Sequence, residues 1–291
     1  MSLRTLLVPL CGAPTDSALL ETAFGLARMS KAHAHAVFTR PDPQEVFVYK
    51  GTLPGAHAEE WETEVSKKIE ATGKADAARS RRTFNKVLKS EGIDKEAPDV
   101  SRQEATGGWE QLVGDPWDIV PSFARFFDLT VFSRESKEHK LARNGLLVET
   151  LMHSGQPVLY YPELSHFKFP SHVLVAWNGS NAATRAIVAA IPILGLVDLV
   201  TIAVVGDEIS SETEVSRLTD YLSAHSIEAT SEFLPSLGKT TGKRILEFAH
   251  ERECDLIVLG GFGHGRYREA IIGGTSRYLL NHADVPLLAM A

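Results

Sequence analysis

The sequence predicts an α/β fold in which two doubly wound domains follow one another, each with a parallel sheet covered by helices on both faces. Short apolar runs alternate with amphipathic segments along the chain, which is the pattern of strands joined by crossover helices. The segment 151–159 (LMHSGQPVL) is repeated at 280–288 (LNHADVPLL), an offset of 129 residues from 151 to 280. The length of 291 residues also favours two domains.

Strands are expected in the N-terminal half where short apolar runs occur, at 3–10, 33–39, 109–113, 129–133 and 157–161. An amphipathic helix is expected at 18–29, with Asp16 or Ser17 as its N-cap. Asp115 followed by Pro116 predicts the start of another helix, because proline is favoured at the first helical position. His33 and His35 share one face of their strand, and we interpret them as polar packing rather than as metal ligands.

The N-terminal half contains an insertion. The opening strands of the two halves correspond at an offset of 167, from Cys11 to Asn178, against 129 near the ends of the halves, so about 38 residues are extra. They are expected at about 40–102, as a loop rich in proline and glycine followed by a polar helix over about 59–90. Trp61, Val65 and Ile69 are spaced four apart and share one face of that helix.

The C-terminal half repeats the same order without the insertion. Strands are expected at 173–177, 199–205, 229–234, 256–259 and 286–290, and helices at 182–194, 212–225, 241–252 and 276–282. The expected domains are therefore 1–162 and 171–291, with a linker over about 162–170.

Composition excludes several classes of function. The net charge of -7 argues against a nucleic-acid-binding surface. No apolar run is long enough to span a membrane, and the chain opens on a strand pattern rather than a signal peptide. The two cysteines, Cys11 and Cys254, do not make a disulfide framework; we expect buried thiols and a cytoplasmic protein.

The strongest functional signal is a glycine-rich connection between the strand 256–259 and the helix that begins near Ser276. Glycines let backbone N–H groups approach an anion closely, and a helix start offers unpaired N–H groups. In doubly wound folds the ligand lies beyond the carboxyl ends of the strands where strand order reverses, which here means near Asn178 and Gly260. The candidate binding residues are Asn178, Gly260, Gly263, His264, Gly265, Arg266, Gly273, Gly274, Thr275 and Ser276. The competing interpretation is that the glycines form tight turns, that Asn178 makes a strand-to-helix turn with an Asx-type cap, that Thr275 or Ser276 caps a helix, and that Arg266 is solvated.

The spacing of Gly260, Gly263 and Gly273 resembles that of the universal stress protein family, and so do the strands at 4–10, 172–180 and 285–290. The resemblance covers nearly the whole chain as two copies, of which the N-terminal one is degenerate. It implies two Rossmann-like domains of the adenine nucleotide alpha hydrolase type. It also implies a stress-response module that binds ATP or a related adenine nucleotide, with magnesium as a candidate companion ion. The last strands of two such domains pair edge to edge in the family, so 157–161 and 286–290 are expected to form an intramolecular pseudo-dimer; a homodimer is a further expectation.

The sequence departs from the family pattern at three places. Gly274 stands where the family has Ser or Thr, which removes one hydroxyl from the expected phosphate site. Asn178 stands where nucleotide-binding members have Asp, and Cys11 occupies that place in the N-terminal half. The segment 133–145 has one glycine at its far end, so the N-terminal half is not expected to bind a nucleotide in the family manner.

Three functions follow as hypotheses. The first is a binding module that responds to a small phosphorylated ligand, with at most slow ATP hydrolysis. The second is a nucleotide-independent interaction protein whose site has been lost. The third is a small-molecule enzyme of another doubly wound family, for example an adenylate-forming one. The sequence contains no zinc-ligand spacing, no Gly-x-Ser-x-Gly elbow and no Gly-Lys-Ser/Thr phosphate loop, which counts against the third.

Overall fold

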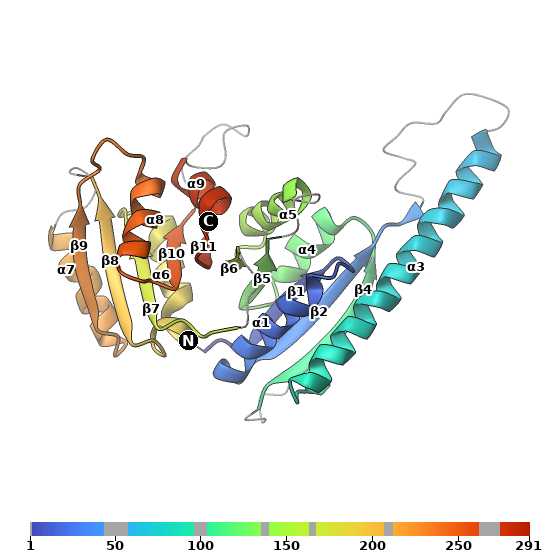
Figure 1. Cartoon of the computed structure of the whole chain (residues 1–291), viewed down its shortest axis with the longest axis horizontal. Helices are drawn as coiled ribbons and strands as arrows, with labels where there is room; N and C mark the ends of the chain where they lie inside the picture. Colours follow the sequence, from blue (N-terminus) through green and yellow to red (C-terminus); the bar gives the residue numbers. More distant parts are fainter. Residues whose placement is uncertain are drawn as a thin grey trace.

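The structure, a computed structural model, describes residues 2–43, 58–95, 104–134, 140–162, 167–206, 212–261 and 274–291. One sheet of 11 strands runs through the whole molecule, with helices on both of its faces (Figure 1). The predicted α/β class is therefore confirmed.

The N-terminal half follows the predicted order with small differences at the ends of elements, except that the helix α5 was not predicted. The third predicted strand begins at Thr106 rather than Trp109, and a two-residue strand, β3, was not predicted. The N-cap of α1 is Thr15, so the prediction of Asp16 or Ser17 as N-cap was wrong. The elements are β1 (Thr5–Leu10), α1 (Asp16–Ser30), β2 (His33–Arg40), α3 (Ala58–Ser90), β3 (Asp94–Lys95), β4 (Thr106–Val113), α4 (Pro116–Ala124), β5 (Leu129–Ser133), α5 (Lys140–His153) and β6 (Val158–Tyr161).

The C-terminal half has the same succession without a long helix, and every strand and helix predicted for it is present. Its elements are β7 (His172–Ala176), α6 (Asn181–Leu194), β8 (Leu199–Val205), α7 (Glu212–Ala224), β9 (Ala229–Leu234), α8 (Thr241–Glu251), β10 (Leu256–Gly260), α9 (Gly274–His282) and β11 (Leu287–Met290). Ser180 caps α6, because its side chain accepts a hydrogen bond from the backbone N–H of Ala183 at 3.1 Å.

The strand order shows that the two halves share one topology. The sheet runs β3-β4-β2-β1-β5-β6-β11-β10-β7-β8-β9, and all neighbours within a half are parallel. In each half the order reverses between the first strand and its neighbour on the other side, β5 beside β1 and β10 beside β7. These reversals are the places where doubly wound folds bind ligands.

The halves join through their last strands, which pair antiparallel. The register places Tyr160 opposite Leu287 and Val158 opposite Ala289. Arg134 crosses the same seam, because its guanidinium donates to the carbonyl of Ala283 at 2.9 Å. The predicted pairing of 157–161 with 286–290 is confirmed, and it covers two sheet edges that would otherwise be exposed.

One aspartate in each half holds the first strand to the fourth. The carboxylate of Asp128 accepts from the backbone N–H groups of Arg4 and Thr5 at 2.8 and 2.9 Å. Asp255 does the same for Ser171 and His172, at 2.9 Å for its shortest contact with each. If the two-residue β3 is left out of the count, each aspartate directly precedes the fourth strand of its half, β5 or β10, so the contact is a structural repeat.

The apolar core consists of two layers, one on each face of the sheet. Alternate residues of β1 point to opposite layers, Leu6 and Val8 to one and Leu7 to the other. The first layer is covered by α1, α3, α6 and α7, and the second by α4, α5, α8 and α9. Both layers contain residues from β6 and β11, so the core continues across the seam.

The helix α3 is the main product of the insertion and has 33 residues. Its C-terminal part packs on the sheet through Ala77, Phe84 and Val87, which are buried at helical spacing. Its N-terminal part extends beyond the sheet, where Trp61 is 47% exposed (Figure 1). No helix in the described part of the chain is long and apolar enough to cross a membrane.

Candidate functional site

Gly260, the last residue of β10, lies directly beneath the first turn of α6. A Cβ atom at this position would stand 2.2 Å from the backbone nitrogen of Ala183. No side chain fits there, so glycine is required by the close approach of helix and strand. The N-terminal end of α6 is thereby held against the carboxyl end of β10.

Gly261 makes the equivalent contact with α9. A Cβ atom at Gly261 would stand 3.3 Å from the hydroxyl of Ser276, which lies in the first turn of α9 and is buried. The N–H of Gly261 is held by the carbonyl of Met290 at 2.8 Å, which continues the β10–β11 ladder. The first turns of α6 and α9 therefore converge on one glycine pair. Because each helix start carries unpaired N–H groups and a positive dipole end, this place favours an anion.

Asn178 follows β7 and lies at the same edge of the sheet. Its side-chain oxygen accepts from the N–H of Ser180 at 3.2 Å, an Asx-type turn that leads into α6. Gly179 has a φ of +71°, which this turn requires. The turn role predicted for Asn178 is confirmed, and the residue is exposed at the strand end.

Gly274 and Thr275 open α9. Gly274 is exposed, and a Cβ atom on it would meet no atom of the described residues within 4 Å. The carbonyl of Thr275 packs against α8, where a Cβ on Gly242 would stand 3.0 Å from it. The structure thus brings Asn178, Gly260 and Ser276 to one edge of the sheet. The predicted residues Gly263, His264, Gly265, Arg266 and Gly273 lie outside the described residues.

Sequence reasoning missed Trp177, which directly precedes Asn178. Its indole N–H is buried and has no hydrogen-bond partner among the described residues, which is costly for a polar group. What singles out Trp177 is the burial of its indole nitrogen. Nothing in the sequence indicated it, because the burial of one atom depends on the tertiary structure.

The histidine pair on β2 is packing, as predicted. His33 is buried and shares a 2.8 Å hydrogen bond with the hydroxyl of Thr106, while His35 lies 3.3 Å from Glu110. Burial, and then the charge of His35, lowers the pKa of His33 to about 4. Burial also lowers the pKa of His35, against the opposing influence of Glu110. A Cβ on Gly108 would stand 2.8 Å from His35, so this glycine makes room for both rings.

The prediction that both cysteine thiols are buried is confirmed for Cys254 and wrong for Cys11. Cys254 is buried, and burial raises its pKa to about 11. Cys11 is exposed, because it lies in the loop that follows β1 rather than in the strand. Among the described residues, no group of three or more His, Cys, Asp or Glu side chains is placed to hold a metal ion.

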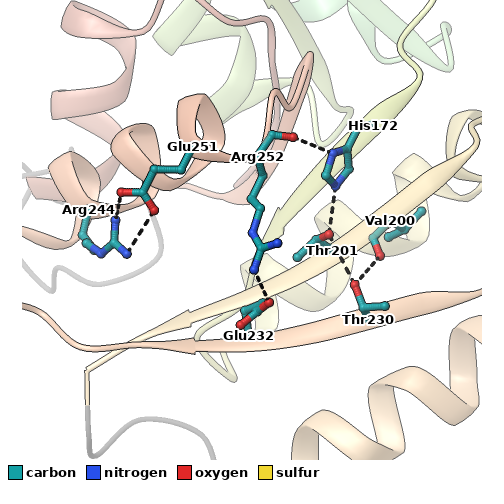
Figure 2. Close-up of polar contacts among 8 residues, drawn as sticks. All are labelled: His172, Val200, Thr201, Thr230, Glu232, Arg244, Glu251 and Arg252. Carbon is teal, nitrogen blue, oxygen red and sulfur yellow. Dashed lines mark hydrogen bonds and ion pairs between the residues drawn. The ribbon is translucent and has the colours of Figure 1, made fainter.

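A second polar cluster lies at the opposite, amino end of the C-terminal strands (Figure 2). The ring of His172 contacts the carbonyl of Arg252 and the hydroxyl of Thr201, both at 2.9 Å. Arg252 also pairs with Glu232 at 2.6 Å. These contacts tie β7, β8 and β9 to the end of α8. His172 begins the strand that Asn178 follows, so the cluster is separate from the glycine pair.

Comparison with known proteins agrees with this geometry. Residues 170–290 match the model of the Universal stress protein family. A universal stress protein from Archaeoglobus fulgidus DSM 4304 shares the fold with a TM-score of 0.68 and 17% identity, over 99% of this chain and 96% of that chain. A protein from Pseudomonas aeruginosa UCBPP-PA14, provisionally named a universal stress protein, gives a TM-score of 0.58 and 15% identity, over 99% and 93%. No curated protein matches the chain.

The chain therefore contains a universal stress protein domain at residues 170–290. The likeness to the solved structures spans both halves and shows the fold alone, because their identities to this chain are low.

Proposed function

We propose that the universal stress protein domain at 170–290 makes this chain a nucleotide-responsive regulatory module of the stress response. ATP, or another small phosphorylated ligand of the adenine nucleotide class, would bind at the carboxyl ends of β7 and β10. The observation that carries the proposal is the convergence of the first turns of α6 and α9 on Gly260 and Gly261. The ligand would favour one conformation of the protein and so alter its contacts with partners.

The described residues fit a phosphate group in two respects. The helix starts supply backbone donors, which do not depend on the hydroxyl that Gly274 lacks. No described atom lies within 4 Å of a Cβ placed on Gly274, so the described residues leave an approach to the start of α9. Asn178 supplies an amide that can hydrogen bond to a nucleoside without adding negative charge. Any magnesium ion would arrive on the nucleotide's phosphates, since the described residues offer no metal-holding cluster.

The same proposal extends to the organisation of the protein. The two domains would divide into 1–162 and 171–291, with the N-terminal copy supporting the C-terminal site. The antiparallel pairing of β6 and β11 supports an intramolecular pseudo-dimer. A homodimer would need a different surface, because that pairing occupies the edges that two separate domains would use. The absence of a disulfide between Cys11 and Cys254 agrees with a cytoplasmic protein.

A thermal-shift titration with ATP, ADP and AMP, with and without magnesium, tests the site. A ligand that binds only the folded state at 100 times its Kd stabilises it by about 2.7 kcal/mol, so the melting temperature should rise with concentration. Gly274→Asp should reduce the shift, because a carboxylate at the start of α9 repels phosphate without a steric clash. Gly263→Val is a second disrupting variant, within the glycine-rich loop.

Gly274→Ala is the matched control, since it adds a Cβ in the same open space and no charge. It should retain the shift, and Gly274→Ser should retain or increase it. Absence of any shift in the wild type at millimolar nucleotide would overturn the proposal. The nucleotide-independent interaction protein would then be the better interpretation, with the β6–β11 seam as the feature that supports it.

A further inference from the structure

The N-terminal half contains a large cavity at the edge of the sheet that corresponds to the candidate site of the C-terminal half. Its volume is about 940 Å³, within the range of sites that hold small organic molecules. The loop after β1 and the end of β2 form one side, and the middle of α3 and the start of α4 form the other. The inserted helix is therefore a wall of this cavity, and none of the described helices and strands of the C-terminal half corresponds to it.

The wall of the cavity is mainly apolar. Its apolar lining residues are Leu10, Val37, Phe38, Ile69, Val120 and Leu146. The indole of Trp117 also lines it. Most of these side chains are held in place by the two core layers, so the wall is preformed. Apolar surface of this kind gains free energy when a ligand displaces water from it.

The internal repeat shows how the phosphate-binding features have been replaced. At the offset of 129, Thr275 and Ser276 of α9 correspond to Leu146 and Leu147 of α5. Gly274 corresponds to Gly145, and a Cβ there would stand 2.4 Å from the ring of Trp117. An indole thus occupies in the N-terminal half a place that no described residue occupies beside Gly274.

The backbone donor after β1 is also already engaged. The carboxylate of Asp16 is fully buried and accepts from the N–H of Gly12 at 2.7 Å. Arg79 of α3 donates to the carbonyl of Gly12 at 3.1 Å and pairs with Asp76 at 3.1 Å. A phosphate here would compete with a buried carboxylate for the same amide and be repelled by its charge. These contacts make the cavity a poor site for a nucleotide.

We propose that this cavity is a second ligand site, specific for a small, uncharged and predominantly apolar molecule. The ligand would lie between the loop after β1 and α3, against Ile69 and Trp117. The inserted helix then has a defined role as one wall of this cavity. This site is independent of the nucleotide proposed for the C-terminal half.

Titration of the full-length protein with N-phenylnaphthylamine, an uncharged probe that fluoresces in apolar surroundings, tests the proposal. We expect saturable binding of one probe per chain that ATP does not displace. Ile69→Glu should weaken probe binding at least about tenfold, because it places a charge against the apolar ligand. Val65→Glu is the matched control: it lies one turn earlier on α3, is also half-buried, and does not line the cavity. It should leave the affinity within about twofold of wild type.

Cys11 gives a second measurement that needs no variant. It is exposed and lines the cavity, whereas Cys254 is buried and serves as an internal reference. At about ten times its Kd the probe should slow alkylation of Cys11 by N-ethylmaleimide about tenfold, measured by mass spectrometry, through simple occupancy. The proposal is overturned if the wild type shows no saturable binding, if Val65→Glu weakens binding as much as Ile69→Glu, or if bound probe leaves the alkylation of Cys11 unchanged. Displacement of the probe by ATP would also overturn it.

Discussion

The two halves of this molecule share one strand order and differ most where a ligand would bind. In the C-terminal half, two glycines at the end of β10 let the starts of α6 and α9 converge, and no atom of the described residues lies within 4 Å of a Cβ placed on Gly274. In the N-terminal half, the corresponding region has Leu146 and the indole of Trp117, and α3 adds a further wall. One topology therefore presents a polar, anion-favouring edge in one copy and an apolar cavity in the other.

The comparison shows that the contacts that hold the sheet together are the same in both halves, whereas the residues at the ligand edge differ. The aspartates Asp128 and Asp255 fix the first strand to the fourth in both halves with the same contacts. The residues at the opposite, carboxyl ends of those strands differ in charge and size between the halves. Contacts that hold the sheet together need the same chemistry in each copy, whereas the ligand edge tolerates replacement.

The largest expected effect is a loss of unfolding free energy when a glycine is replaced by alanine. Its size should depend on what the added Cβ atom would contact. Gly260→Ala should cost about 3 kcal/mol of unfolding free energy, because its Cβ meets the backbone of α6, which has no room to move. Gly145→Ala should cost about 1 kcal/mol, since the ring of Trp117 can shift and alanine favours a helix. Gly274→Ala should change the stability by less than about 0.5 kcal/mol. Urea unfolding measures all three, and equal costs would contradict the close approach of α6 to β10.

The second prediction tests the aspartate repeat. Asp255 uses both of its carboxylate oxygens to hold Ser171 and His172, and it is half-buried. Asp128 uses one oxygen for all its contacts and is exposed. Asp255→Asn should therefore cost about 2 kcal/mol and Asp128→Asn about 1 kcal/mol or less. Chemical denaturation of both variants checks this, and a larger loss for Asp128→Asn would show that the two contacts are not equivalent.

The third prediction is that each of two substitutions impairs binding at one proposed site and leaves the other site unaffected. Gly274→Asp should weaken nucleotide binding about tenfold and leave N-phenylnaphthylamine binding unchanged. Ile69→Glu should do the reverse. Both ligands should be titrated into both variants by isothermal calorimetry or fluorescence. A variant that impairs both ligands together would mean that the halves do not act as separate sites.

The last prediction concerns acid. Because the folded-state pKa of His33 is about 4 and the ordinary value is 6.5, the unfolded state binds more protons between these values. Stability from this residue is therefore complete above pH 6.5 and decreases as the pH falls toward 4. The C-terminal counterpart of β2, β8, contains no histidine. His33→Gln should make unfolding free energy less dependent on pH in this window, measured by urea titrations at several pH values; an unchanged slope would show that His33 is not the cause.

The sequence was sufficient to predict most of the fold. Apolar periodicity located the helices apart from α5 and the strands apart from β3, because a buried sheet needs continuous apolar runs and its covering helices need one apolar face. The repeat between 151–159 and 280–288 predicted that the last strands would correspond, and their pairing is confirmed. The remaining errors were local, at the start of β4, the N-cap of α1 and the two-residue β3, where a few hydrogen bonds rather than a pattern decide the boundary.

The sequence alone determined the fold class, the order of elements and the positions of the glycines, because each depends on local periodicity or on residue type. Only the tertiary structure decided what those glycines and apolar residues face. That Gly260 lies beneath Ala183, and that Trp117 fills the space beside Gly145, are contacts between segments distant along the chain. The cavity against α3 is likewise made by residues from 9 to 146. A cavity has no sequence signature, because its lining residues come from separate segments of the chain. Nothing in their type or spacing shows that the space between them is unfilled.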